Sequence, residues 1–151
     1  MELSDRIEEL LNRQAYLIDI FPKTVPQKAD NRYFAVEKYF QHNRSEFERK
    51  LIAIILKLYC YYDLTVVSEE SITENPQVVE LTLRLEKCFS GEHGYINIFL
   101  PECEAVMLLN YGDLYMTAYN VSGELKELLA QLVSSEGLFL YDAPLGNTGD
   151  E

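Results

Sequence analysis

The sequence has no tryptophan and only two histidines, His42 and His93, among its 151 residues. So few histidines leave little room for a histidine-based catalytic triad or a common zinc site. His93 lies between Cys88 and Cys103, and Cys60 could supply a fourth ligand. Structural zinc sites usually contain closely spaced cysteine pairs, whereas these three cysteines are far apart in the chain. We therefore predict no bound metal.

A nucleophilic cysteine is not favoured either. The set that could be assembled is Cys103 with His93 and either Glu102 or Glu104. No catalytic signature surrounds this cysteine, and two adjacent carboxylates would disfavour its thiolate form. The sequence thus predicts no catalytic residue and favours a role other than catalysis.

Cofactor motifs are also lacking. The glycine-flanked segments 91–94 and 146–149 have neither the lysine of a P-loop nor a strand–turn–helix context. Adjacent carboxylates such as Glu69 and Glu70 could serve acid–base chemistry, but among 25 acidic residues such pairs are expected by chance. We predict no cofactor.

Long apolar runs are absent, since Lys57 interrupts a run of only twelve residues and a membrane-spanning helix needs roughly 20. The first residues show neither the basic nor the apolar region of a signal peptide. Three cysteines, an odd number, suit a reducing compartment better than a disulfide framework. The prediction is a cytoplasmic protein without a membrane partner.

Basic residues are scarce in the C-terminal part of the chain. Residues 63–151 contain sixteen acids but only Arg84, Lys87 and Lys126, whereas residues 31–62 carry a net charge of +3 and the whole chain −12. Nucleic acids are bound through clustered basic side chains, so they are not an expected partner. The acidity suits either simple solubility or a basic protein partner.

What the chain does contain is typical of a globular protein, with 48% hydrophobic and 25% charged residues. We predict one domain over residues 1–142 and a flexible tail over 143–151, which has little to bury. The main feature is the segment 45–62, which has apolar residues on most of a helical wheel and one narrow polar stripe. It predicts a core helix, started by a capping box of Ser45 and Glu48.

The remaining elements follow from periodicity and turn residues. An amphipathic helix is predicted from Ser4 to about Asp19, and another after Ser122, ended by Gly137. Residues 33–41 suit a strand or a short helix, and their aromatic and β-branched content favours a strand. Residues 64–67 form a short apolar segment. Strands are also predicted at 78–86, 95–100 and 138–142, with a hairpin formed by 105–110 and 114–120.

This order of elements predicts an α+β fold. A mostly antiparallel sheet of about four to five strands would pack against the central helix 45–62, with amphipathic helices near both ends of the chain. The order of the strands in the sheet stays open.

Eleven tyrosines are the remaining unusual feature. In the predicted hairpin, Tyr115 and Tyr119 project to one face, opposite the aliphatic side chains, and Tyr111 lies near the turn. Tyrosine is common in the centres of protein interfaces, although it also packs between strands. With the nearby acids Glu102 and Glu104, these tyrosines form a predicted interaction surface.

The resulting hypothesis is a small acidic protein-interaction module. Its partner would be a basic protein, such as an enzyme or toxin that it neutralises in the manner of an immunity protein. One alternative is an enzyme or small-molecule-binding protein with a pocket lined by tyrosine and glutamate between the central helix and the sheet. A homo-oligomeric structural subunit is another.

Overall fold

The computed structural model describes residues 2–90, 94–110 and 112–144, with only the backbone at Asp30. These residues form five α-helices and seven strands. The helices are α1 (Leu3–Leu10), α2 (Asp30–His42), α3 (Arg44–Leu58), α4 (Val78–Phe89) and α5 (Gly123–Ser135). The strands are β1 (Ala15–Asp19), β2 (Thr65–Val67), β3 (Ile72–Glu74), β4 (Tyr95–Leu100), β5 (Ala105–Asn110), β6 (Tyr115–Tyr119) and β7 (Phe139–Asp142).

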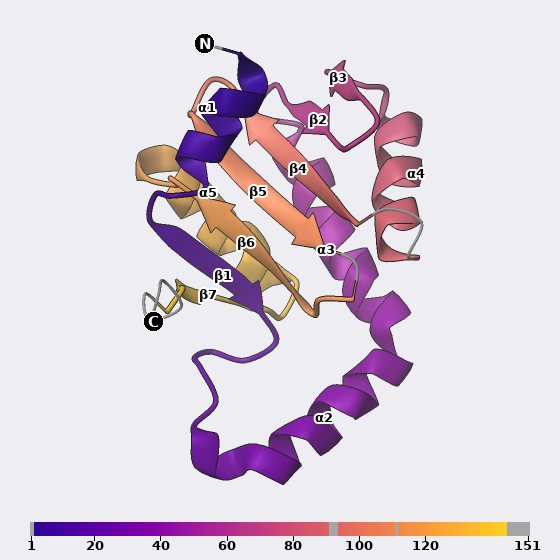
Figure 1. Ribbon diagram of the computed structural model, residues 1–151, viewed down its shortest axis with the longest axis vertical. Helices are drawn as coiled ribbons and strands as arrows, with labels where there is room; N and C mark the ends of the chain where they lie inside the picture. Colours follow the sequence, from indigo (N-terminus) through magenta and orange to yellow (C-terminus); the bar gives the residue numbers. More distant parts are fainter. Residues whose placement is uncertain (1, 91–93, 111, 145–151) are drawn as a thin grey trace.

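The strands form one sheet in the order β3-β2-β4-β5-β6-β1-β7, and all of its described pairs are antiparallel (Figure 1). The predicted α+β class with an antiparallel sheet is therefore confirmed. The predicted number of strands, four to five, was too low. β2 and β3 are only three residues long, and β1 is five, so their patterns are too short to stand out.

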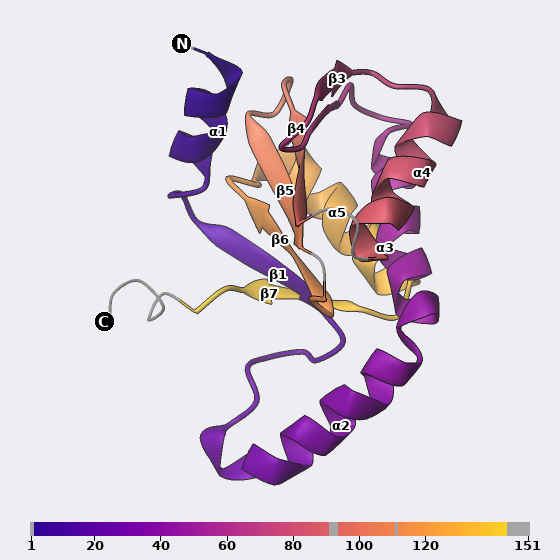
Figure 2. The same ribbon diagram turned by 45° about the vertical axis from the view of Figure 1, so that its right-hand side comes forward.

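The two faces of the sheet are covered differently. Helices α3, α4 and α5 lie on one face, and α1 lies on the other (Figure 2). The main core lies between the three helices and the sheet, where alternate strand residues such as Ile18, Ile98, Met107 and Met116 are fully buried. A smaller cluster joins α1 to β4 and β5 through Ile7, Leu10, Phe99 and Val106.

Helix α3 is the buried central helix that its sequence predicts. Its buried residues are Phe47, Leu51, Ile52, Ile54, Ile55 and Leu58. The predicted boundaries were inaccurate, because the helix ends at Leu58 rather than residue 62. The capping box is not formed either: the N-cap is Asn43, and Ser45 lies within the first turn, where Arg44 pairs with Glu48 at 3.4 Å.

Three segments differ in type from their predictions. Residues 78–86 form helix α4 rather than a strand, and residues 33–41 belong to helix α2. The first helix stops at Leu10, and residues 15–19 form the strand β1 rather than the end of that helix. In α4 the side chains at 81, 85, 88 and 89 are buried, which is a helical spacing hidden within the apparent alternation of the sequence.

The C-terminal predictions are confirmed more closely. β5 and β6 form the predicted hairpin, and β7 is the predicted last strand. Helix α5 ends at Ser135, and Gly137 follows its C-cap with a φ of +77°, which suits glycine. The N–H of Leu138 donates to the Val133 carbonyl at 3.1 Å. Residues 145–151 of the predicted tail lie outside the described residues. Within the described part of the chain, we find no helix with the length and apolar character needed to span a membrane.

Candidate functional site

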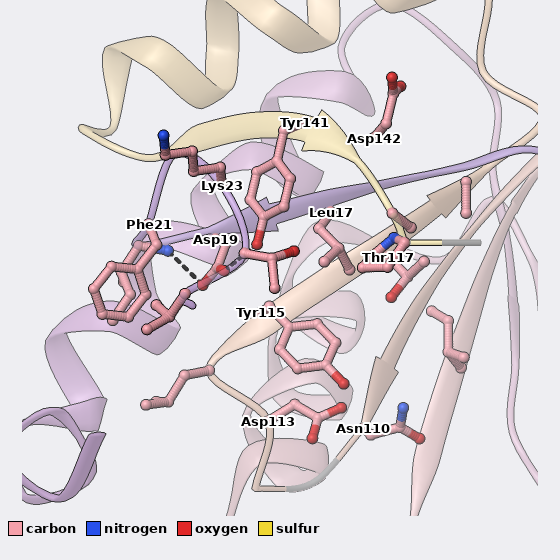
Figure 3. A pocket seen from close by; sticks show the side chains of 18 of the residues that line it. Leu17, Asp19, Phe21, Lys23, Asn110, Asp113, Tyr115, Thr117, Tyr141 and Asp142 are labelled. Carbon is pink, nitrogen blue, oxygen red and sulfur yellow. Dashed lines mark hydrogen bonds between the residues drawn. The ribbon is translucent and has the colours of Figure 1, made fainter. Parts of the chain in front are cut away.

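A broad cleft lies on the face of the sheet opposite α3, α4 and α5. Helix α1 covers the other part of this face, so β1, β6 and the neighbouring ends of β5 and β7 remain open as the floor of the cleft. The segment 20–27 and the first turns of α2 form its rim. The cleft has a volume of about 1200 Å³. Figure 3 shows it from close by.

Asp19 lies at the centre of this cleft because of the strand pairing. β1 runs between β6 and β7, with Asp19 directly opposite Tyr115 on β6, and Leu17 opposite Tyr141 on β7. The hydroxyl of Tyr141 donates to Asp19 Oδ2 at 2.7 Å, and the N–H of Ile20 donates to Oδ1 at 2.7 Å. Both carboxylate oxygens are thus held in place (Figure 3).

Partial burial makes the ionised form of Asp19 unfavourable. Desolvation raises the pKa of its carboxyl above the ordinary 3.8, although the hydrogen bonds from Tyr141 and from the Ile20 and Phe21 amides oppose that rise. Burial raises the pKa of the Tyr141 hydroxyl even more strongly, and the adjacent Asp19 adds to the effect. The tyrosine therefore stays a neutral hydrogen-bond donor.

Asp113 is a second carboxylate on the cleft wall, just before β6. Burial raises the pKa of its carboxyl, while hydrogen bonds from Asn110 and Tyr115 act in the opposite direction. The ring of Tyr115 lies between Asp19 and Asp113 (Figure 3), and both carboxylates contribute to a raised pKa of its hydroxyl after the larger effect of burial. Tyr115 is thus hydrogen-bonded to Asp113 and lies close enough to Asp19 to be affected by its charge.

The rim adds more aromatic and acidic groups. On α2, the Tyr33 hydroxyl donates to Glu37 Oε2 at 3.4 Å, and the Tyr33 ring lies 6.0 Å from that of Phe21 between centroids. Burial, followed by the charge of Glu37, raises the pKa of the Tyr33 hydroxyl. This part of the cleft therefore has the same pairing of tyrosine with carboxylate as its floor.

The charged side chains that line the cleft are mostly acidic. They are the carboxylates of Asp19, Glu37, Asp113 and Asp142 and the basic groups of Arg13 and Lys23. In Figure 3, the carboxylate of Asp142 and the amine of Lys23 point away from Tyr115. No basic side chain is among the groups that shift the pKa of Asp19 or Asp113, so the inner part of the cleft around them is acidic.

The structure divides the predicted interaction surface. Tyr115 and Tyr119 lie on the face of β6 that lines the cleft, as the alternation in the hairpin predicts. Glu102 and Glu104 are in the turn between β4 and β5 and do not line it. Glu104 forms an ion pair with Arg6 of α1, and Glu102 Oε1 accepts from the Asp63 N–H at 2.8 Å. Tyr111 lies outside the described residues.

The cysteines do not belong to this site. Cys88 is buried in the main core, and desolvation raises the pKa of its thiol to about 11. Burial also raises the pKa of Cys103, whose thiol is hydrogen-bonded to Tyr62, while Cys60 is exposed. His93 lies outside the described residues, and among those that are described no three His, Cys, Asp or Glu side chains group as metal ligands.

Asp19, Asp113, Glu37 and Tyr141 were not among the predicted site residues. The sequence pattern predicts Asp19 at the end of a helix, and nothing in the sequence indicates that β1 pairs with both β6 and β7. The available signal was the alternation Tyr16-Leu17-Ile18-Asp19, in which a carboxylate shares a strand face with Leu17.

Comparison of the chain with protein-family models, with curated proteins and with solved structures gave no match. The functional argument therefore depends on the geometry and chemistry of the cleft.

Proposed function

We propose that this protein is an interaction module that receives a basic segment of a partner protein in the cleft. The observation that carries the proposal is the position of Asp19 and Asp113 on either side of Tyr115 in an open cleft. A lysine or arginine side chain that entered between them would meet two carboxylates and an aromatic ring.

The raised pKa values of Asp19 and Asp113 support a cationic ligand. Burial makes the charged form of each carboxyl less favourable, and no basic side chain is among the causes that act on either pKa. A bound cation would stabilise both ionised carboxylates and lower both pKa values. Binding would then offset part of the free-energy cost of burying these two carboxylates.

The size and lining of the cleft favour a peptide segment. Small-molecule pockets are usually about 300–1000 Å³, and this cleft, at about 1200 Å³, is larger. Tyr33, Tyr115, Tyr119 and Tyr141 line it, and tyrosine is enriched in the cores of protein interfaces because its ring adds apolar area and its hydroxyl a hydrogen bond.

The expected mechanism is occlusion of a basic surface of the partner. A chain with a net charge of −12 attracts a basic partner over a distance, which speeds association. The cleft would then supply the specific contacts. An inhibitor that neutralises a basic enzyme or toxin, as immunity proteins do, would work in this way.

A cationic small molecule is the second candidate ligand. The charges of Asp19 and Asp113 both raise the pKa of the Tyr115 hydroxyl, so both carboxylates lie near the same tyrosine, where a small cation could contact them together. The cleft lies on the face of the sheet opposite α3, not between α3 and the sheet as the sequence suggested for a ligand pocket. Calorimetric titration with spermine and with arginine tests this version. Saturable binding that Asp19→Asn abolishes would support it, and heats indistinguishable from dilution would contradict it.

The main proposal is tested by capture and reconstitution. The tagged protein is used to retain partners from the native lysate at low salt, and each retained protein is purified and titrated by calorimetry. We expect a basic partner. Its Kd should increase at least about tenfold with Asp19→Asn/Asp113→Asn, which corresponds to a loss of about 1.4 kcal/mol of binding free energy. Tyr115→Ala should also weaken binding.

The matched control is Glu127→Gln, which removes one exposed carboxylate on α5, away from the cleft. It should change the Kd much less than either cleft variant, and circular dichroism should show that all variants are folded. A partner whose affinity is the same for wild type, Asp19→Asn/Asp113→Asn and Tyr115→Ala would disprove this role for the cleft.

A further inference from the structure

The floor of the cleft is organised in rows of side chains that cross the strands. Residues that pair between neighbouring strands project to the same face of the sheet, so they form a line across it. Asp19 and Tyr115 are paired in this way, and we call this line the acidic row. Two residues further along the strands lies a second line, the apolar row, which consists of Leu108, Thr117, Leu17 and Tyr141.

The apolar row contains no charged side chain, and all of its side chains are half-buried. Leu17 lies between Tyr141 and Thr117 (Figure 3). The two hydroxyl groups of the row already have partners, because that of Thr117 is hydrogen-bonded to Tyr119 and that of Tyr141 to Asp19. The row therefore offers the cleft mainly apolar surface.

The same face of the sheet is covered elsewhere by α1. There Phe99 and Val106 are buried against Ile7 and Leu10 of the helix. Helix α1 ends at Leu10, and the apolar row lines the open cleft instead. An apolar group of a ligand that covered this row would remove apolar surface from water on both sides, which favours binding.

We propose that the partner's segment binds in an extended conformation, with a basic residue at the acidic row and a large apolar residue two positions away at the apolar row. The basic residue is the one that the proposed function places between Asp19 and Asp113, so this inference rests on that function. Residues two apart in an extended chain project to the same side, about 7 Å from each other. Asp19 and Leu17 are also two residues apart on a strand, so the rows have the same separation.

The charges around the two rows determine which residue binds at which row. A basic side chain at the acidic row is close to Asp19 and Asp113, whereas an apolar side chain there would desolvate both carboxylates without supplying an opposite charge. Other charged groups of the cleft do not reverse this order. Arg13 precedes the start of β1, and the charged ends of Lys23 and Asp142 point away from the acidic row (Figure 3).

NMR titration of the ¹⁵N-labelled full chain with capped heptapeptides tests the spacing. Each peptide contains one arginine and one leucine among serines, placed one, two, three or four positions apart in both orders, so charge and composition stay constant. With a spacing of two, one of the orders should bind at least about fivefold more tightly than every other spacing, because both side chains then reach their rows. Tighter binding at three or four positions, which suits a helix, overturns the extended conformation.

Substitutions in the chain connect this preference to the apolar row. Leu17→Ala should remove the preference and leave the weaker binding of the other spacings nearly unchanged. The matched control is Leu83→Ala, which shortens a 53% exposed leucine of α4 on the other side of the sheet and should keep the preference (Figure 2). Asp19→Asn/Asp113→Asn should weaken the binding of all the peptides.

Failure of this inference is distinguishable from failure of the proposed function. Equal binding at every spacing, weakened throughout by Asp19→Asn/Asp113→Asn, would leave the cleft as a site for basic segments and overturn the spacing. A preference that Leu17→Ala leaves unchanged also overturns it. If no peptide shifts the amide signals of the cleft residues at millimolar concentration, both the spacing and the proposed function are wrong. The comparison of spacings uses the wild-type chain, so it does not depend on the folding of any variant.

Discussion

Asp19 has two opposing effects on the stability of the fold. Its carboxylate orders the β1–β7 side of the sheet through Tyr141 and the start of the following loop through the Ile20 amide. Burial nevertheless makes its charge unfavourable, as the raised pKa shows. A residue that costs stability when ionised and faces an open cleft is typical of a binding site, where function rather than stability explains the choice of side chain.

We expect Asp19→Asn to stabilise the protein at neutral pH. The raised pKa means that the folded state binds this proton more tightly than the unfolded state, so the wild type loses stability as pH rises from the ordinary 3.8 through the folded-state pKa. Asparagine carries no charge to desolvate. Its amide can accept from the Ile20 N–H and donate to the Tyr141 oxygen, so both contacts can be kept.

The measurement is the free energy of unfolding by urea at pH 3.5 and pH 7. At pH 7 the free energy of unfolding of Asp19→Asn should be larger than that of the wild type. The difference should shrink at pH 3.5, where the wild-type carboxyl is protonated. The exposed-carboxylate variant Glu127→Gln serves as the control. A wild type more stable than Asp19→Asn at pH 7 would show that the hydrogen bonds outweigh the desolvation of the charge.

At the scale of elements, α3 organises the main core. It contacts α4 on one side and α5 on the other, and its buried side chains also face the sheet. Near its end, Lys57 Nζ lies 3.0 Å from Glu136 Oε2, which follows α5. This ion pair connects the positively charged segment of the chain with the acidic C-terminal part.

Shortening a buried side chain of α3 should lower the stability of the protein. Ile55 is fully buried, and Ile55→Ala should lower the free energy of unfolding by about 2–5 kcal/mol, because it removes apolar contacts and leaves a cavity. The control Val36→Ala on α2, where the side chain is 39% exposed, should cost less than about 1 kcal/mol. Chemical denaturation measures both. Similar costs for the two variants would show that α3 is not the centre of the core.

At the scale of the whole molecule, charge is distributed unevenly. The chain carries −12 in total, and the acids are concentrated after residue 62. The described part has three ion pairs, Arg6–Glu104, Arg44–Glu48 and Lys57–Glu136, which leave most of the acids uncompensated. Like charges held together in a compact state repel one another and reduce its stability.

Moderate salt should therefore stabilise the protein. As NaCl rises from 0.01 M to 0.15 M, the screening length falls from about 30 Å to about 8 Å, and repulsion between distant carboxylates is reduced. We expect the thermal unfolding midpoint to rise over this range. Glu127→Lys, which lowers the net negative charge, should flatten the salt dependence. A midpoint that falls with added NaCl would indicate that the few ion pairs matter more than the overall repulsion.

The sequence alone determined those features that depend on neighbouring residues. The apolar wheel of 45–62 predicted the buried helix α3, alternation predicted the face of Tyr115 and Tyr119, and Gly137 predicted the end of α5. It did not determine the type of residues 78–86, because Leu81 and Leu85 are also four residues apart and so fit a helix as well as a strand. Only burial against α3 distinguishes these patterns.

The tertiary structure decided where the cleft lies and which residues meet there. Asp19, Tyr115 and Tyr141 come from strands about 25 to 120 residues apart in the chain, and they meet because β1 pairs with both β6 and β7. Such pairing depends on which sheet edge remains free after the local elements have packed, and no short stretch of sequence contains that information. The sequence predicted Tyr115 as part of a surface, but it predicted neither Tyr141 nor the carboxylates of Asp19 and Asp113 beside it.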